Sequence, residues 1–129
     1  MEKSKHTKTL SQILTIIGNK WTLLIIYNLQ RSSVRFTNLQ RAVGGITHKS
    51  LSSELKRLEK EGIVSRTVYA EVPIRVEYRL TEKGIALLSA ARNILHWGTQ
   101  YYPDKQTDLP RYTPLDAGSL RRAYGLTEA

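Results

Sequence analysis

Apolar residues recur at helical spacing in the first part of the chain. The i, i+3, i+4, i+7 pattern of one helix face is formed by Leu10, Ile13, Leu14 and Ile17. Gly18 and Asn19 tolerate the left-handed conformation and are expected to end this helix. A second helix is predicted from Lys20 onward. Because that segment is apolar on nearly every side, we expect it to be the central core helix.

Polar and turn-forming residues then divide the next part of the chain into short elements. Residues 34–36 favour a short strand. Thr37 and Gln40 match the capping box, in which the threonine hydroxyl accepts from an amide and the glutamine reaches back to the cap. A short helix is therefore predicted from Thr37 to Val43, followed by a turn at Gly44 and Gly45.

A longer helix is expected from about Thr47 to about Glu61, closed by Gly62. Residues 64–69 and 75–80 then predict a β-hairpin, with residues 70–74 as an exposed loop. Thr81 is expected to cap a last helix with an apolar stripe. Two short helices joined by a glycine turn and followed by a hairpin predict a winged helix-turn-helix, mainly α with a small β-hairpin.

The longer helix of the predicted helix-turn-helix has two chemically distinct faces. Leu51, Leu55 and Leu58 fall together and are expected to face the core. The opposite face carries hydroxyls and lysines, namely Lys49, Ser53, Lys56 and Lys60, flanked by Ser52 and Arg57. Such a face suits a recognition helix, whose N-terminal half (His48, Lys49, Ser52, Ser53) would enter the major groove most deeply. A merely solvated face is the alternative.

Other candidate DNA contacts lie on either side of this helix. Arg75, in the hairpin, suits a minor groove or a phosphate, or equally an ion pair with Glu71 or Glu77. Arg35, Thr37 and Asn38 are candidates for backbone contacts, with capping as the alternative role of Thr37. Lys20 suits either a phosphate or solvent.

Net charge concentrates in one part of the chain. The sequence has 129 residues, a formal net charge of +9 and no cysteine. Residues 1–102 hold 16 basic and seven acidic residues, whereas residues 103–129 are neutral and contain three of the four prolines. We expect a DNA-binding domain over 1–102 and an extension over 103–129, with partial order and disorder equally open. The basic excess favours nucleic acid, an anionic membrane surface or an acidic protein.

Several segments resemble the HxlR family of bacterial transcription regulators. I-G-N-K-W-T-L-L-I at residues 17–25 is similar to the family segment I-G-G-K-W-T-L-L-I, and R-F-T-N-L at 35–39 to R-F-x-E-L. L-S-S-E-L-K-R-L-E-K-E-G-I-V at 51–64 resembles the family's recognition helix and its exit. Residues 67–73 and 75–81 resemble its wing. Trp97 and Gly98 lie where the family often has a Trp-Gly pair.

The resemblance implies a homodimer formed by the first and last helices, and hence a pseudo-palindromic DNA site. The apolar residues compatible with that contact are Leu10, Ile13, Leu14, Leu88, Ala91, Ile94 and Leu95, with packing inside the chain as the alternative. Many family members carry a cysteine before the first helix, and several sense oxidants through it. This sequence has none, so thiol sensing is not expected, and any signal would be a small ligand, a protein or abundance.

No enzyme motif is recognisable, and the three histidines lack metal-ligand spacing, so neither cofactor nor metal is expected. No apolar run approaches a membrane span and the N-terminus lacks a signal-peptide pattern, which predicts a cytoplasmic protein. The sequence therefore predicts a homodimeric, sequence-specific, non-thiol transcription regulator. A protein-interaction module and a non-specific nucleic-acid binder are the alternatives. An effector pocket would involve Trp21, Tyr27 or Trp97, although core packing is the favoured role of these side chains.

Overall fold

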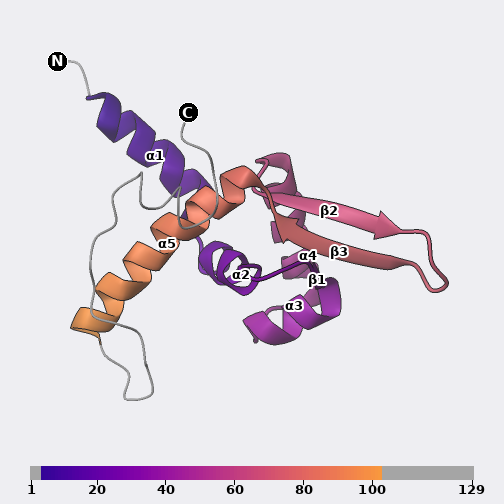
Figure 1. The fold of residues 1–129 in the computed structure, drawn as a ribbon. Coiled ribbons are helices and arrows are strands. Elements are labelled where there is room, and N and C mark those ends of the chain that lie inside the picture. Colours follow the sequence, from indigo (N-terminus) through magenta and orange to yellow (C-terminus); the bar gives the residue numbers. More distant parts are fainter. Residues whose placement is uncertain (1–3, 103–129) are drawn as a thin grey trace.

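The computed structural model describes residues 4–102, so the predictions for residues 103–129 lie outside the described part of the chain. Five helices and three strands follow one another: α1 (Lys5–Ile17), α2 (Thr22–Asn28), β1 (Val34–Arg35), α3 (Phe36–Val43), α4 (His48–Lys60), β2 (Val64–Tyr69), β3 (Arg75–Leu80) and α5 (Glu82–Tyr101). This is the predicted order, and the winged helix-turn-helix is confirmed (Figure 1).

The core lies among α2, α3, α4, the base of the hairpin and the start of α5. Its fully buried side chains come from all of these elements and include Ile25, Ile26, Leu39, Leu51, Leu55, Leu58, Ile63 and Leu88. The prediction that α2 is central is confirmed by Ile25 and Ile26. The helix is apolar on nearly every side but is not covered on every side, because Leu24 and Tyr27 remain more than a third exposed.

The predicted cap at Thr81 and the predicted helix start at about Thr47 are confirmed, and Thr47 is itself a cap. The Thr47 hydroxyl accepts from the Ser50 amide at 3.1 Å, and the Thr81 hydroxyl accepts from the Gly84 amide at 3.1 Å. Gly62 follows α4 with φ +76°, the left-handed conformation that a helix-ending glycine supplies. The hydroxyl cap of Thr47 therefore defines the start of α4, and the left-handed conformation of Gly62 defines its end.

The capping box at Thr37 is wrong. Helix α3 already begins at Phe36, directly after β1, and Arg35 at its N-cap makes no side-chain capping bond. Gln40 does not reach back to the helix start. Its Nε2 donates to the Ile46 carbonyl at 3.1 Å, which ties α3 to the residues leading into α4. Thr37 is thus an exposed residue within the first turn.

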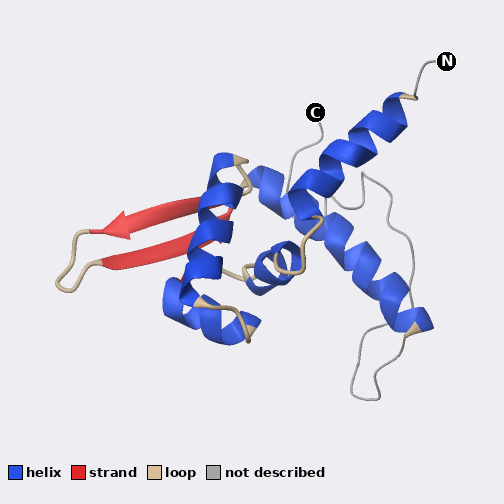
Figure 2. Ribbon diagram, turned by 180° about the vertical axis from the view of Figure 1, so that it is seen from behind, coloured by secondary structure: helices blue, strands red, loops and turns tan. Residues whose placement is uncertain are grey.

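The three strands form an antiparallel sheet in the order β1-β3-β2. Val64 pairs with Leu80 at the base of the hairpin and Tyr69 with Arg75 near its tip, so the strand bounds match the prediction. Figures 1 and 2 show the hairpin projecting from the body, with α4 lying across its base. The loop at residues 70–74 is exposed, as expected.

Helix α1 extends away from this body and meets α5 near the start of the latter (Figures 1 and 2). Helix α2 starts at Thr22 rather than at the predicted Lys20, because the Asn19 side chain accepts from the amides of Trp21 and Thr22. Within residues 4–102, no single helix has the length and apolarity to cross a membrane, and only α1 and α2 together, bent by 70°, pass that test.

Candidate nucleic-acid interface

Helix α4 presents a continuous polar face to solvent. Leu51, Leu55 and Leu58 are buried to within 1% of complete burial, and this fixes the rotation of the helix about its axis. The opposite side is exposed at Lys49, Ser53, Lys56 and Lys60, with His48 exposed at its start and Ser52 half-buried at its edge. The predicted outward face of the helix therefore forms as one surface, which we call the α4 face.

The start of the α4 face is held against α3. The Phe36 and His48 rings lie 4.5 Å apart between centroids, and Phe36 also contacts the Tyr78 ring at 6.4 Å. Gly44 and Gly45 both have positive φ, at 73° and 69°, and produce the sharp turn between the two helices. This turn brings the N-terminal end of α4 beside α3.

The candidates preceding α4 lie at the start of α3. Arg35, Thr37 and Asn38 are all exposed. The Asn38 side-chain oxygen accepts a long, 3.4 Å hydrogen bond from Arg41, which lies one turn further along α3. These three side chains are accessible to a ligand that spans α3 and the α4 face.

Arg75 forms the ion pairs within the hairpin that were one of the two roles considered for it. Its guanidinium pairs with Glu71 at 3.1 Å and with Glu77 at 3.3 Å, and it lies 3.9 Å from the centroid of the Tyr69 ring. These contacts leave only 27% of the Arg75 side chain exposed. The hairpin therefore carries an arginine whose charge is balanced by two carboxylates of the same hairpin.

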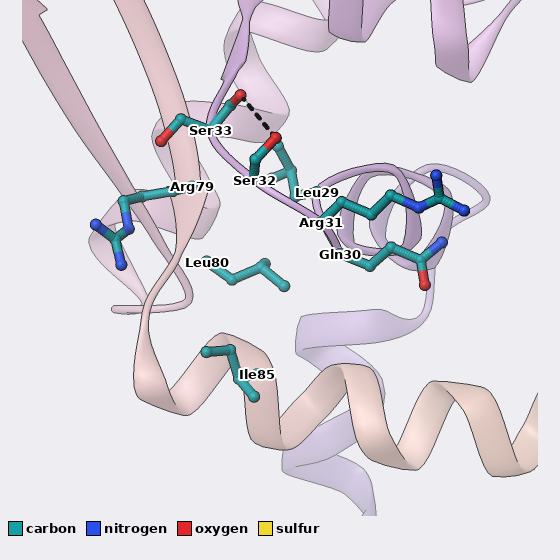
Figure 3. Close-up of a pocket in the computed structure, with 8 residues that line it drawn as sticks. All are labelled: Leu29, Gln30, Arg31, Ser32, Ser33, Arg79, Leu80 and Ile85. Carbon is teal, nitrogen blue, oxygen red and sulfur yellow. Dashed lines mark hydrogen bonds between the residues drawn. The ribbon is translucent and has the colours of Figure 1, made fainter. Parts of the chain in front are cut away.

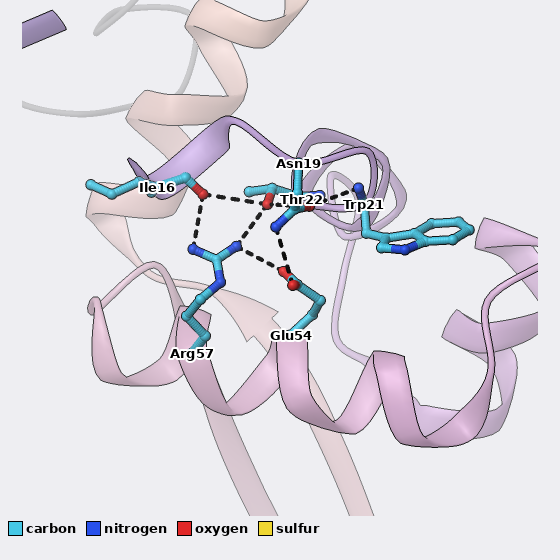
Figure 4. Close-up of polar contacts among 6 residues, drawn as sticks. All are labelled: Ile16, Asn19, Trp21, Thr22, Glu54 and Arg57. Atoms are coloured by element: carbon cyan, nitrogen blue, oxygen red, sulfur yellow. Dashed lines mark hydrogen bonds and ion pairs between the residues drawn. The ribbon is translucent and has the colours of Figure 1, made fainter. Parts of the chain in front are cut away.

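Arg57 does not belong to the α4 face, contrary to the prediction that it flanks that face. Figure 4 shows its side chain turned toward the junction of α1 and α2. It donates to the Ile16 carbonyl at 2.9 Å, to the Thr22 hydroxyl at 2.7 Å and to Glu54 at 2.7 Å. Because Ile16 lies 41 residues away in sequence, helical periodicity alone could not identify this contact.

The predicted dimer residues divide into two groups. Leu10 and Leu14 of α1 and Ile94 of α5 are at least 50% exposed, Ile13 is 38% exposed and Leu95 is half-buried. Leu88 and Ala91, at 1% and 9%, lie inside the protein, and we remove them from the proposed contact. The apolar stripe of α5 is core at its start and exposed further along.

Sequence reasoning did not assign an exposed aromatic group at the end of α5. The Trp97 ring lies 5.6 Å from that of Tyr101 and 6.2 Å from that of Tyr102. All three are about half or more exposed. Their i, i+4 and i, i+5 spacing was the available signal, and it extends the exposed apolar surface of α5 beyond Ile94.

An open cavity of about 280 Å³ lies between the end of α2, the end of β3 and the start of α5. Leu80 and Ile85 form its apolar floor, whereas Arg31 and Arg79 extend to opposite sides of it (Figure 3). A smaller apolar cavity of about 120 Å³ lies between α1 and α5. Trp21, Tyr27 and Trp97, the expected pocket residues, line neither of them. Residues 4–102 contain no cluster of potential metal ligands.

A capped recognition helix, an accessible α3 and a projecting hairpin define a winged helix-turn-helix DNA-binding protein. The chain belongs to the HxlR-like helix-turn-helix family, whose model matches residues 16–106. It is 46% identical over 88 residues to the uncharacterized HTH-type transcriptional regulator BH0655 of Halalkalibacterium halodurans, covering 67% of this chain and 78% of that protein. The protein is therefore a DNA-binding transcription regulator of this family.

Solved structures agree with the fold. One is a transcriptional regulator from Porphyromonas gingivalis that is assigned to the MarR family. It has a TM-score of 0.71 and 37% identity, covering 78% of this chain and 98% of that chain. The redox regulator HypR in its oxidised form has a TM-score of 0.66 and 37% identity, covering 70% and 93% of the two chains. Redox control thus occurs on this architecture.

Proposed function

We propose that the protein is a homodimeric, sequence-specific transcription regulator that reads a pseudo-palindromic operator with the α4 face. The α4 face carries the proposal: an exposed row of lysines and small hydroxyls on a helix whose rotation is fixed by buried leucines. Small hydroxyl side chains allow close approach to base edges, and lysines reach the flanking phosphates. His48, Lys49, Ser52 and Ser53 are the proposed groove residues, with Lys56 as a phosphate contact.

The first turn of α3 is proposed to add contacts to the DNA backbone. Arg35, Thr37 and Asn38 are exposed and precede the turn into α4. In a helix-turn-helix the first helix crosses the DNA backbone while the second occupies the groove. We assign these three side chains to phosphates and therefore expect them to contribute affinity more than sequence preference.

The exposed apolar surfaces of α1 and α5 support the proposed dimer. Helix α1 has no buried residue along its 13 positions, although Leu10, Ile13 and Leu14 face one side. A helix of that length is marginal in water by itself and requires packing for stability. A second copy supplies it, and two-fold symmetry places the two recognition helices about one DNA turn, roughly 34 Å, apart.

Removing the lysines of the α4 face tests the DNA-binding proposal. We expect the Lys49→Ala and Lys56→Ala double variant to bind a selected operator more weakly, on the order of tenfold to a hundredfold. The slope of log affinity against log salt should fall in magnitude by at least about 1.8, because each of the two copies in the dimer loses the phosphate contact of Lys56. Fluorescence anisotropy over a salt series measures both quantities.

The Lys5→Ala and Lys8→Ala double variant is the matched control for that measurement, since it removes the same number of charges from α1, on the opposite side of the molecule from the hairpin (Figure 1). Its affinity and salt slope should remain near the wild-type values. An unchanged slope in the Lys49→Ala and Lys56→Ala double variant would contradict the assignment of the α4 face. Recovery of an acidic protein partner, with no DNA bound at low salt, would support a protein-interaction module instead.

Arg75→Ala distinguishes the two roles considered for the hairpin arginine. Because Arg75 is already paired with Glu71 and Glu77, we expect the variant to keep the wild-type salt slope. The same salt series measures it. A slope smaller by about 1.8 would instead mean that Arg75 leaves its carboxylates and contacts one phosphate from each copy in the dimer.

The proposed regulator does not use a thiol, because the sequence contains no cysteine that could be oxidised. A thiol oxidant such as diamide should leave operator affinity unchanged. We place the protein in the cytoplasm, where its proposed DNA target lies, and propose no catalytic role.

A further inference from the structure

We infer that Arg57 is a positioning residue that fixes the angle between the proposed dimer helix α1 and the recognition helix α4. The inference rests on the proposed function, because that angle matters only when two copies must place two α4 helices on one duplex. It concerns a residue on the recognition helix that faces away from the α4 face. Its expected effect is therefore on geometry and spacing preference, with the number of phosphate contacts unchanged.

One guanidinium binds both sides of the joint between α1 and α2. Arg57 Nη1 donates to the carbonyl of Ile16 in the last turn of α1, and Arg57 Nη2 donates to the hydroxyl of Thr22, the first residue of α2. The chain bends by 70° between those two helices. The planar fork of arginine can span two such acceptors, whereas a lysine ammonium on its flexible stem provides no such fixed geometry.

Two further residues close these contacts into a ring, which we call the joint clamp: Asn19, Thr22, Glu54 and Arg57. Glu54 accepts from Arg57 through one oxygen, at 2.7 Å, and from the Asn19 amide through the other, at 3.1 Å. The Asn19 oxygen in turn accepts from the Trp21 and Thr22 amides. Figure 4 shows all four clamp residues converging between the α1–α2 joint and α4.

The hydrogen bonds of the joint clamp satisfy polar groups that would otherwise lack partners. The last carbonyls of α1 lack intrahelical donors, and Arg57 supplies one at Ile16. Thr22 is completely buried, so its hydroxyl requires a partner there. Helices α1 and α4 do not pack extensively on each other in the described residues, so these hydrogen bonds make a direct connection between them. A change in the angle of α1 must therefore either move α4 or break the clamp.

Asn19 is the member of the clamp in which this chain differs from the family segment it resembles. The family segment I-G-G-K-W-T has glycine at this position, whereas this chain has I-G-N-K-W-T. Glycine can neither donate to Glu54 nor accept from the amides of α2. The asparagine side chain therefore adds a link between the joint and α4 that a glycine would lack, and Asn19→Gly removes that link together with the side-chain cap of α2.

The test uses the full chain and a duplex selected by the wild-type protein from a random library. The variants are Arg57→Lys, Thr22→Val and Asn19→Gly, with Thr22→Ser as the matched control that keeps the hydroxyl. We expect the first three to bind the selected duplex roughly three- to thirtyfold more weakly at an unchanged salt slope. Thr22→Ser should bind within about twofold of wild type. Circular dichroism selects a temperature at which every variant is folded.

A spacing series separates positioning from a purely structural role. Duplexes whose half-sites are moved by one base pair in either direction are compared with the selected duplex. We expect the wild type to discriminate against them and the three clamp variants to lose at least about half of that discrimination. Variants that melt earlier but keep both affinity and spacing preference when folded would overturn the inference, as would an Arg57→Lys variant with wild-type binding.

The outcomes also distinguish this inference from the proposed function. A wild-type protein that enriches no duplex overturns both. A wild type that selects a palindromic duplex, with clamp variants that match it in affinity and spacing, overturns the inference alone. If Thr22→Ser behaves like Thr22→Val, the hydroxyl is not the relevant group and the clamp is likewise overturned.

Discussion

Replacing Leu14 by glutamate is expected to convert the protein to a monomer and to weaken operator binding by at least about a hundredfold. Leu14 is 55% exposed on the apolar side of α1, and a carboxylate there would be buried without a partner in the proposed dimer. Loss of the second recognition helix removes the effective-concentration advantage of two linked sites, which is on the order of 10² to 10⁴. Sedimentation equilibrium and fluorescence anisotropy measure the two effects.

Gln12→Glu provides the control on the same helix. It adds the same charge at an exposed position, nearly opposite Leu14 on the helical wheel. We expect it to remain a dimer with close to wild-type affinity. A Leu14→Glu protein that sediments as the wild type does would mean that α1 is not part of the contact between copies.

Truncating Leu55 to alanine is expected to lower the free energy of unfolding by about 2–5 kcal/mol. Leu55 is 1% exposed and lies in the buried row of α4 that faces the core. The loss is large because removing a buried leucine side chain forfeits its transfer free energy from water and leaves a cavity. Urea denaturation followed by circular dichroism measures the loss, and Lys60→Ala is the exposed control on the same helix. A loss below about 0.5 kcal/mol would contradict the orientation of α4.

Local chemistry explains which parts of the fold could be predicted from the sequence. The hairpin bounds, the cap at Thr81 and the helix start near Thr47 depend on residues only a few positions apart, and these three predictions are confirmed. The cap at Thr37 failed although its motif is equally local. Strand β1 pairs with β3 as far as Arg35, and α3 begins at the next residue, which leaves Thr37 inside the helix. Pairing with a distant strand thus outweighed the local signal.

The candidate interface shows the same division. The outward face of α4 follows from helical periodicity once the leucines are known to be buried. The inward turn of Arg57 could not be predicted, because its acceptors Ile16 and Thr22 lie 41 and 35 residues away. Leu88 belongs to the apolar stripe of α5, which is buried at its start and exposed in its later part. Helical periodicity does not show at which residue the stripe passes from buried to exposed. Contacts between elements distant in sequence determine which of these side chains are buried and which are exposed.

The absence of any buried residue in α1 has a consequence for how much protein a cell needs. In the proposed dimer, ordering of α1 and association of two chains are one equilibrium, so both depend on total protein concentration. The melting temperature should then rise as the sample is made more concentrated. In the cell, operator occupancy would rise more steeply than in proportion to synthesis of the protein. Gene dosage itself would then be a regulatory input.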